Sequence, residues 1–189
     1  MHRIVIFASG SGSNALNLIR HFNSGDFARV VGVFCNKPDA GVIHKAEAEQ
    51  VEVTLFNRND FYHTEEVISK VAALQPDIIV LAGFLWLVPS SFIKAFDGKI
   101  INLHPSLLPK FGGKGMYGHH VHEAVLAAGE KYTGITIHLV NEEFDKGEKI
   151  YQDQFEIPAN ATVSDVEQLI HQLEHKGMPI AVEQFLKRL

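Results

Sequence analysis

The sequence predicts an α/β protein with a Rossmann-like, doubly wound and mainly parallel sheet that carries an antiparallel pair of strands near its carboxyl end. In the first half of the chain, apolar runs rich in Val and Ile alternate with segments of helical spacing. Such runs are typical of strands buried on both faces. Toward the carboxyl end, only residues 141–148 join two strand-like runs, which leaves no room for a crossover helix and favours an antiparallel pair. With no repeat and no linker, we expect a single domain over residues 1–189.

The predicted elements of the first half follow this alternation. Strands are expected at residues 3–8, 30–34, 51–55, 78–82 and 100–102, and helices at residues 14–22, 40–49, 62–74 and 89–96. The last of these helices opens with Pro89, a residue type favoured in the first helical turn. Strands and helices that alternate in this way form a parallel sheet with right-handed crossovers.

The pattern changes after residue 102. A loop rich in glycine and proline extends to about residue 118, followed by an expected helix at 119–128, strands at 134–140 and 149–157, and a closing helix at 164–174. Ser164 is the candidate N-cap of the closing helix, and Glu167 stands three residues later, which is the spacing of a capping box.

The composition argues against several classes of partner. A formal net charge of −5 provides no basic field for nucleic acid, whereas a small phosphorylated metabolite needs only one local anion site. The apolar runs, such as residues 78–84, are far shorter than the roughly 20 residues of a membrane-spanning helix. We therefore expect a cytoplasmic protein with no nucleic-acid or membrane partner. We also expect a monomer or a homodimer.

A glycine-rich loop joins the first strand to the first helix, and it consists of Gly10, Ser11, Gly12, Ser13 and Asn14. Glycines allow a tight turn, and the free N–H groups at a helix start can then point at a bound anion. The loop lacks the third glycine of a dinucleotide fingerprint and the lysine of a P-loop. The alternative is a plain strand–helix turn with Ser13 as the N-cap.

The most informative segment is Asn102-Leu103-His104-Pro105-Ser106-Leu107-Leu108-Pro109, at the carboxyl end of a predicted buried strand. Open α/β sheets bind their ligands at this edge. Asn102 and His104 are two residues apart, so an extended backbone points both side chains to the same side. Together they can hold an oxygen that gains negative charge. The alternative is a His–Pro turn that merely leaves the sheet.

This octet resembles the signature of the formyltransferases that use 10-formyltetrahydrofolate. Other features of that family recur along nearly the whole chain: the Gly-Ser-Gly-Ser-Asn loop, residues 36–41, residues 81–84, residues 134–138 and residues 145–147. The octet marks the folate chemistry, and the early glycine loop is similar to that of the members that act on glycinamide ribonucleotide in de novo purine biosynthesis. The resemblance thus implies an enzyme that moves a formyl group from the co-substrate 10-formyltetrahydrofolate to the amine of that ribonucleotide.

The resemblance also implies a catalytic set of Asn102, His104 and Asp145. Taken alone, the turn that contains Asp145 is an ordinary Asp-Lys-Gly turn with a solvated carboxylate. The resemblance brings Asp145 against His104, where its charge would favour the protonated imidazole. The free amine would attack the formyl carbon directly, so we expect no metal and no covalent enzyme intermediate.

The substrate pockets are assigned by the same resemblance. The residues expected at the phosphate and ribose are Gly10, Ser11, Gly12, Ser13, Asn14 and Glu174. Those expected at the folate are Leu85, Trp86, Leu87, Val88, Val140, Asn141, Glu142, Glu143 and Phe144. Trp86 departs from the family pattern, where a basic residue is common, and we expect its indole to pack. Lys110 is a candidate second contact to phosphate or to the folate glutamate.

The loop at residues 112–118 is longer and richer in glycine than is usual in the family, which suggests a lid over the folate. His119, His120 and His122 follow it. His119 and His122 share a helical face, but no His-Glu-x-x-His motif is present, so we expect a helix start near the substrate with no metal.

Four other functions remain open at this stage. A 10-formyltetrahydrofolate hydrolase would use the same side chains with water as acceptor, but it usually carries an additional amino-terminal domain. A methionyl-tRNA formyltransferase needs a carboxyl-terminal nucleic-acid-binding domain. A sugar-amine formyltransferase explains the early glycine loop less well, and a non-catalytic folate- or nucleotide-binding module would have no use for the catalytic set.

Overall fold

The computed structural model describes every residue of the chain except Phe144. Within this part, the strands are hydrogen-bonded in the order β3-β2-β1-β4-β5-β6-β7. Their bounds are β1 His2–Ala8, β2 Ala28–Cys35, β3 Val53–Leu55, β4 Ile78–Leu81, β5 Ile100–His104, β6 Tyr132–Leu139 and β7 Lys149–Glu156. The helices are α1 Ser13–Asn23, α2 Val42–Ala48, α3 Arg58–Tyr62, α4 Glu66–Ala73, α5 Ser90–Ala95, α6 His119–Ala127 and α7 Val163–Leu186. The mainly parallel sheet with an antiparallel pair confirms the predicted fold class.

The chain forms two compact units. The first comprises Met1–Ile101 with Leu189, and the second comprises Asn102–Arg188. The boundary falls within β5. The expectation of a single domain over the whole chain stays a prediction.

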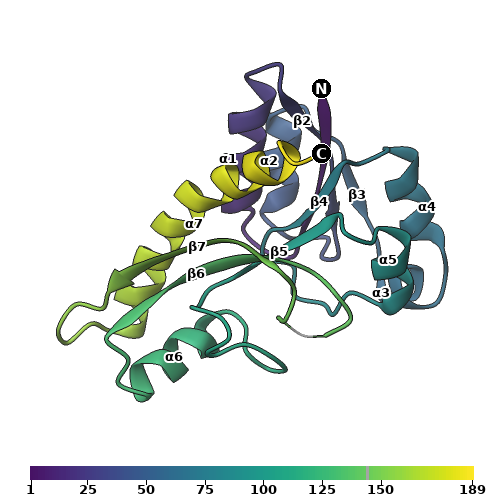
Figure 1. Ribbon diagram of the computed structural model, residues 1–189. Coiled ribbons are helices and arrows are strands. Elements are labelled where there is room, and N and C mark those ends of the chain that lie inside the picture. The colour runs from purple at the N-terminus through teal and green to yellow at the C-terminus, as the bar shows by residue number, and fades with distance from the viewer. Residues whose placement is uncertain (144) are drawn as a thin grey trace. The chain divides into compact units, whose positions relative to one another are not determined.

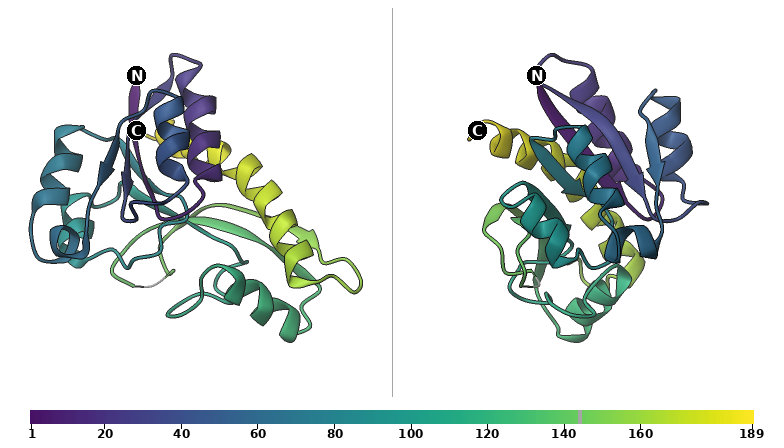
Figure 2. Two further views of the ribbon diagram at one scale, coloured as in Figure 1. Left: turned by 180° about the vertical axis from the view of Figure 1, so that it is seen from behind. Right: turned by 90° about the vertical axis from the view of Figure 1, so that its right-hand side faces the viewer.

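The first unit is a parallel α/β layer. β1 pairs in parallel with β2 and with β4, and Ala8 lies opposite Cys35 at the carboxyl edge of the β1–β2 pair. The rings of Phe7 and Phe34 stack at 5.0 Å between these strands, and both residues are fully buried. Helices α1 and α2 lie side by side in this unit (Figure 2). The early glycine loop, residues 10–14, follows directly after the carboxyl end of β1.

The second unit is built on the β6–β7 pair. These strands are antiparallel, with Tyr132 opposite Glu156 and Ile137 opposite Tyr151, as their short connection predicted. The long helix α7 runs along both strands (Figure 1). It approaches closely at Gly177, where an added Cβ would lie 2.7 Å from the ring of Tyr151. Because Gly177 has no side chain, α7 can pack directly on the β6–β7 pair.

Two predicted helices differ from those observed. The helix expected at residues 62–74 is divided into α3 and α4, because Asn57 and Asp60 form a capping box that starts α3 earlier. The closing helix begins with a capping box of Thr162 and Asp165, not of Ser164 and Glu167, and it continues through Pro179 to Leu186. Pro179 is buried, so packing of α7 outweighs the cost of a proline inside a helix.

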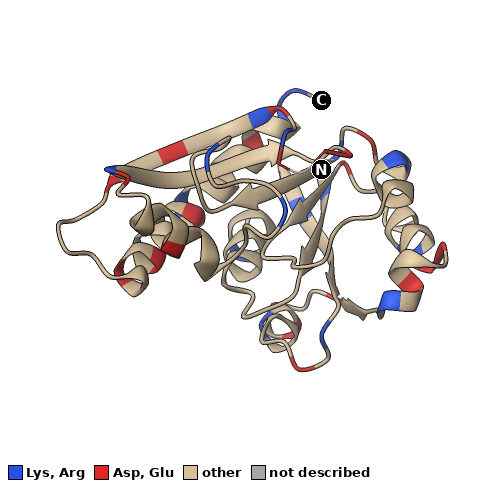
Figure 3. Ribbon diagram, turned by 90° about the horizontal axis from the view of Figure 1, so that it is seen from below, with Lys and Arg blue, Asp and Glu red and all other residues tan. Residues whose placement is uncertain are grey.

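In the described part of the chain, no helix combines the length and the apolar character needed to cross a membrane. Lys and Arg residues are dispersed over several elements and interspersed with Asp and Glu (Figure 3).

Candidate active site

Asn102 and His104 both lie on β5, in the second unit, two residues apart as the sequence analysis required. His104 is buried, with 3% of its surface exposed. Its Nε2 lies 2.8 Å from the carbonyl oxygen of Phe111. Because a carbonyl can only accept, Nε2 carries the hydrogen and donates it to Phe111. In the neutral ring, Nδ1 is then the free base.

Asp145 faces that base. Its Oδ2 lies 3.6 Å from His104 Nδ1 and accepts a hydrogen bond from the N–H of Gly113 at 2.8 Å. The backbone of Asp145 is left-handed, with φ of 53°, a conformation that Asp tolerates better than most residues. Gly147 closes the turn, and a Cβ there would collide with the backbone oxygen of Leu139. The Asp-Lys-Gly turn therefore has a geometric reason for its glycine.

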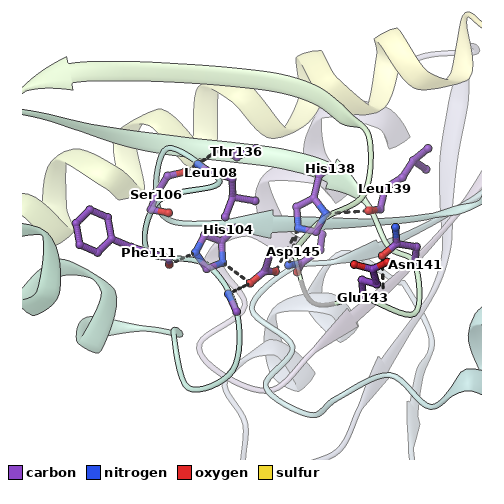
Figure 4. A network of polar contacts seen from close by, with 12 residues as sticks. His104, Ser106, Leu108, Phe111, Thr136, His138, Leu139, Asn141, Glu143 and Asp145 are labelled. Carbon is purple, nitrogen blue, oxygen red and sulfur yellow. Dashed lines mark hydrogen bonds and ion pairs between the residues drawn. The ribbon is translucent and has the colours of Figure 1, made fainter.

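His138 on β6 lies between Asn102 and Asp145, and Figure 4 shows its ring beside Asp145. Its Nε2 lies 3.3 Å from Asn102 Nδ2 and 3.5 Å from Asp145 Oδ1. Its Nδ1 donates to the carbonyl of Leu139 at 2.8 Å, which fixes the ring. His138 is not among the site residues expected from the sequence. The available signal was a histidine within an otherwise apolar strand, in one of the segments that resemble the family.

The charges at this site are set by burial and by close partners. Burial lowers the pKa of His104, and this effect outweighs Asp145 and the Phe111 carbonyl, which raise it. Burial raises the pKa of Asp145, but the nearby His138 side chain, the hydrogen bond from the Gly113 N–H and the His104 imidazole bring it below its usual value. As expected, Asp145 favours the protonated imidazole, but burial has the larger effect on the pKa of His104. Together these shifts favour a neutral His104 beside an ionised Asp145 in the resting site.

A buried polar network holds the segment that follows β5. The Oγ1 of Thr136 donates to the Ser106 carbonyl at 2.7 Å and accepts from the Leu108 N–H at 3.1 Å. Lys149 Nζ donates to the Leu108 carbonyl at 2.6 Å, and Gln152 donates to Thr136 Oγ1 at 2.8 Å. The segment between His104 and Phe111 is thus tied to β6 and β7.

The early glycine loop lies in the first unit. Gly12 has φ of 75° and is itself the N-cap of α1, without a side-chain cap, so the alternative of Ser13 as N-cap is wrong. A Cβ on Gly12 would lie 2.5 Å from the Cα of Val42, which requires glycine there. Lys45 Nζ donates to the Ser11 carbonyl at 2.7 Å. A helix start without a side-chain cap and with a cation beside it suits an anion.

The first segment expected at the folate, residues 85–88, also lies in the first unit. Leu85 and Leu87 are 51% and 56% exposed, and Val88 is buried. Trp86 packs as expected, with its ring 5.9 Å from that of Phe56. The guanidinium of Arg58 lies 5.1 Å over the indole, within the range of a cation–π contact.

The remaining expected residues lie in the second unit, except that Phe144 falls outside the described residues. Val140 is half-buried, Asn141, Glu142 and Glu143 are exposed, and the side chain of Asn141 accepts the Glu143 N–H at 3.0 Å. Glu174 on α7 is 7% exposed. The Nδ1 of His171 lies 2.9 Å from one of its oxygens, so part of that carboxylate is already engaged.

The other candidates were Lys110 and the histidines at the start of α6. Lys110 Nζ pairs with both carboxylate oxygens of Glu130, at 2.8 and 3.0 Å. His122 is buried, whereas His119 is exposed. The possible ligand atoms of His119, His120 and Glu123 lie within 4.8 Å of one another, and all three residues are exposed.

The comparisons with known proteins agree with one another. A family model described as formyl transferase matches residues 2–182. The chain is 35% identical over 191 residues to a phosphoribosylglycinamide formyltransferase of Bacillus subtilis, covering 98% of this chain and 95% of that protein. It is 36% identical to the chloroplastic protein of the same name from Arabidopsis thaliana, covering 92% of this chain and 62% of the plant protein. The crystal structure of phosphoribosylglycinamide formyltransferase from Brucella melitensis aligns with a TM-score of 0.88 at 37% identity, covering 98% of this chain and 95% of that one.

Proposed function

The chain belongs to the formyl transferase family, and on this premise we propose that it transfers the formyl group of 10-formyltetrahydrofolate to the amine of glycinamide ribonucleotide, a step of purine biosynthesis. Relatives that match nearly the whole chain carry the name of this activity. The observation that carries the proposal is the grouping of Asn102, His104 and Asp145, with His138 between Asn102 and Asp145.

The reaction needs a donor to an oxyanion and a path for a proton. The ribonucleotide amine attacks the formyl carbon, a C–N bond forms, and the carbonyl electrons move to oxygen. Asn102 stabilises that oxygen. Its Nδ2 carries two N–H donors, and the Nε2 of His138 can accept only one of them. A single donor of this kind typically contributes about 3 kcal/mol to the transition state.

His104 and Asp145 carry the proton. The free Nδ1 of His104 takes up the proton lost from the attacking nitrogen, directly or through water, beside the Asp145 carboxylate 3.6 Å away. Two opposite unit charges at that separation attract by about 1 to 5 kcal/mol, depending on solvent access. The proton then passes to the folate nitrogen as the C–N bond to the formyl carbon breaks. Tetrahydrofolate and the formylated ribonucleotide leave.

The proposed substrate contacts are those expected from the sequence. Gly10, Ser11, Gly12, Ser13 and Asn14 hold the phosphate at the start of α1, and Glu174 holds the ribose hydroxyls. The folate is bound by the segments at residues 85–88 and 140–144. 10-formyltetrahydrofolate is a co-substrate, and attack by a free amine needs no metal. A cytoplasmic location and a monomeric or dimeric state belong to the same proposal.

The test is release of tetrahydrofolate with and without glycinamide ribonucleotide. We expect release only when the ribonucleotide is present, with its formylated product formed in equal amount. Release without the ribonucleotide would indicate a hydrolase instead. No release under either condition would contradict the proposed transfer.

A further inference from the structure

Residues 111–113, where the loop before α6 begins, contact both His104 and Asp145 through backbone atoms. The carbonyl of Phe111 accepts from His104 Nε2 at 2.8 Å. The N–H of Gly113 donates to Asp145 Oδ2 at 2.8 Å. We propose that residues 111–113 are a positioning clamp, whose backbone fixes the tautomer of His104 and points its free Nδ1 at Asp145. This inference rests on the proposed function.

The choice of tautomer matters for the proposed reaction. A neutral imidazole has one N–H and one free nitrogen, and the partner of one nitrogen decides the state of the other. Without the Phe111 carbonyl, the hydrogen would be free to sit on Nδ1, where the Asp145 carboxylate would accept it. Nδ1 could then no longer take up a proton. The Phe111 carbonyl keeps the hydrogen on Nε2 and so preserves Nδ1 as a base toward Asp145.

The backbone of the clamp is strained. Phe111 has φ of 54°, a left-handed conformation that costs a residue with a side chain roughly 1–2 kcal/mol. Such strain persists only where the surroundings impose it, and it is found preferentially at functional sites. Here the preceding residues are fixed, because Ser106 Oγ donates to the Lys110 carbonyl at 2.7 Å and Leu108 is tied to β6 and β7.

Gly112 is the point at which the clamp can be tested by a small change. A Cβ there would lie 2.5 Å from Leu108 Cδ2, 3.4 Å from Asp145 Cβ and 3.6 Å from Asp145 Oδ2. Its φ is outside the left-handed region, so alanine would act by contact and not by backbone strain. Leu108 is buried, with 3% exposed, and leaves little room. Gly112→Ala should therefore displace the segment from His104 and Asp145.

The experiment compares Gly112→Ala with Gly177→Ala in the full chain. Gly177 lies outside the proposed site, and a Cβ there would lie 2.7 Å from Tyr151 and 2.9 Å from Ile135. The control therefore also crowds a packed contact in the second unit, without touching the clamp. We expect Gly112→Ala to lower kcat by about 10²-fold with little change in KM, and Gly177→Ala to lower Tm while keeping kcat at 25 °C. In an Asp145→Asn background, Gly112→Ala should have little further effect, because both act through one pair.

A second measurement does not depend on activity. The nitrogen chemical shifts of the His104 imidazole in the unliganded protein report its tautomer directly. We expect the Nε2–H form in the wild type and a larger fraction of the Nδ1–H form in Gly112→Ala. The clamp would be contradicted by an Nδ1–H form in the wild type, or by a kcat in Gly112→Ala equal to that of an active wild type. An inactive wild type with the Nε2–H form would refute the proposed function and leave the clamp standing.

Discussion

Thr136→Val tests whether the buried network supports the proposed catalytic residues. Valine has nearly the same shape as threonine but removes the hydroxyl that bonds Ser106 and Leu108. Thr136 and Ser106 are fully buried, and Leu108 is 3% exposed, so water cannot replace the lost partner. Gln152 is exposed and can turn to solvent.

The expected loss of stability follows from two orphaned backbone groups. An unsatisfied buried group costs about 1–3 kcal/mol, so the Leu108 N–H and the Ser106 carbonyl together cost about 2–6 kcal/mol. The additional apolar group of valine returns about 1 kcal/mol. A net loss of about 1–5 kcal/mol in the free energy of unfolding corresponds to a fall in Tm of roughly 2–20 °C for a chain of this size. Because Leu108 leads into the clamp, kcat should also fall.

The assay is denaturant unfolding and steady-state kinetics of Thr136→Val beside Thr136→Ser. Serine keeps the hydroxyl and loses one methyl group, which costs about 1 kcal/mol. We expect Thr136→Ser to keep most of kcat and Thr136→Val to lose it. Equal kcat values in the two variants, or a Thr136→Val protein as stable as the wild type, would refute the reasoning that the hydroxyl positions this segment.

Three further predictions concern the site and its charges. Asp145→Asn should lower kcat by about 10²–10⁴-fold with folding unchanged, as steady-state kinetics and circular dichroism would measure. Burial lowers the pKa of both His104 and His122, so at these two positions the unfolded chain binds more protons than the folded one. Denaturant titrations should therefore show stability falling as the pH drops below about 6.5, by up to about 1.4 kcal/mol per pH unit for each histidine, and His122→Gln should reduce the slope. Gly12→Ala should destabilise the protein far more than Gly10→Ala in thermal unfolding. A Cβ at Gly12 would lie 2.5 Å from the Cα of Val42 in α2, whereas a Cβ at Gly10 would meet nothing within 4 Å.

The strands and the paired positions on β5 could be predicted from local pattern. Continuous apolar runs identified β1, β2 and β4, and the two-residue spacing placed Asn102 and His104 on one strand. The extent of α7 could not be predicted, because the packing of Gly177 and Pro179 decides it and not their helix propensity.

The rest of the site depends on contacts between distant parts of the sequence. His138 joins the site because a neighbouring strand brings it to Asn102, 36 positions away along the chain. The Phe111 carbonyl and the Gly113 N–H are backbone atoms, which no residue pattern marks as functional. The resting charge of His104 depends on its burial, and burial of a polar side chain is a property of the fold.

Transfer of an isotope-labelled formyl group tests the central claim most directly. The protein would be mixed with 10-formyltetrahydrofolate labelled in that group and with glycinamide ribonucleotide, and the mass of the ribonucleotide would be followed for the wild type and for Asp145→Asn. We expect the wild type to place the label on the ribonucleotide, and the variant to do so more slowly by orders of magnitude. Label recovered as formate, or equal rates in the two proteins, would contradict direct transfer at this site.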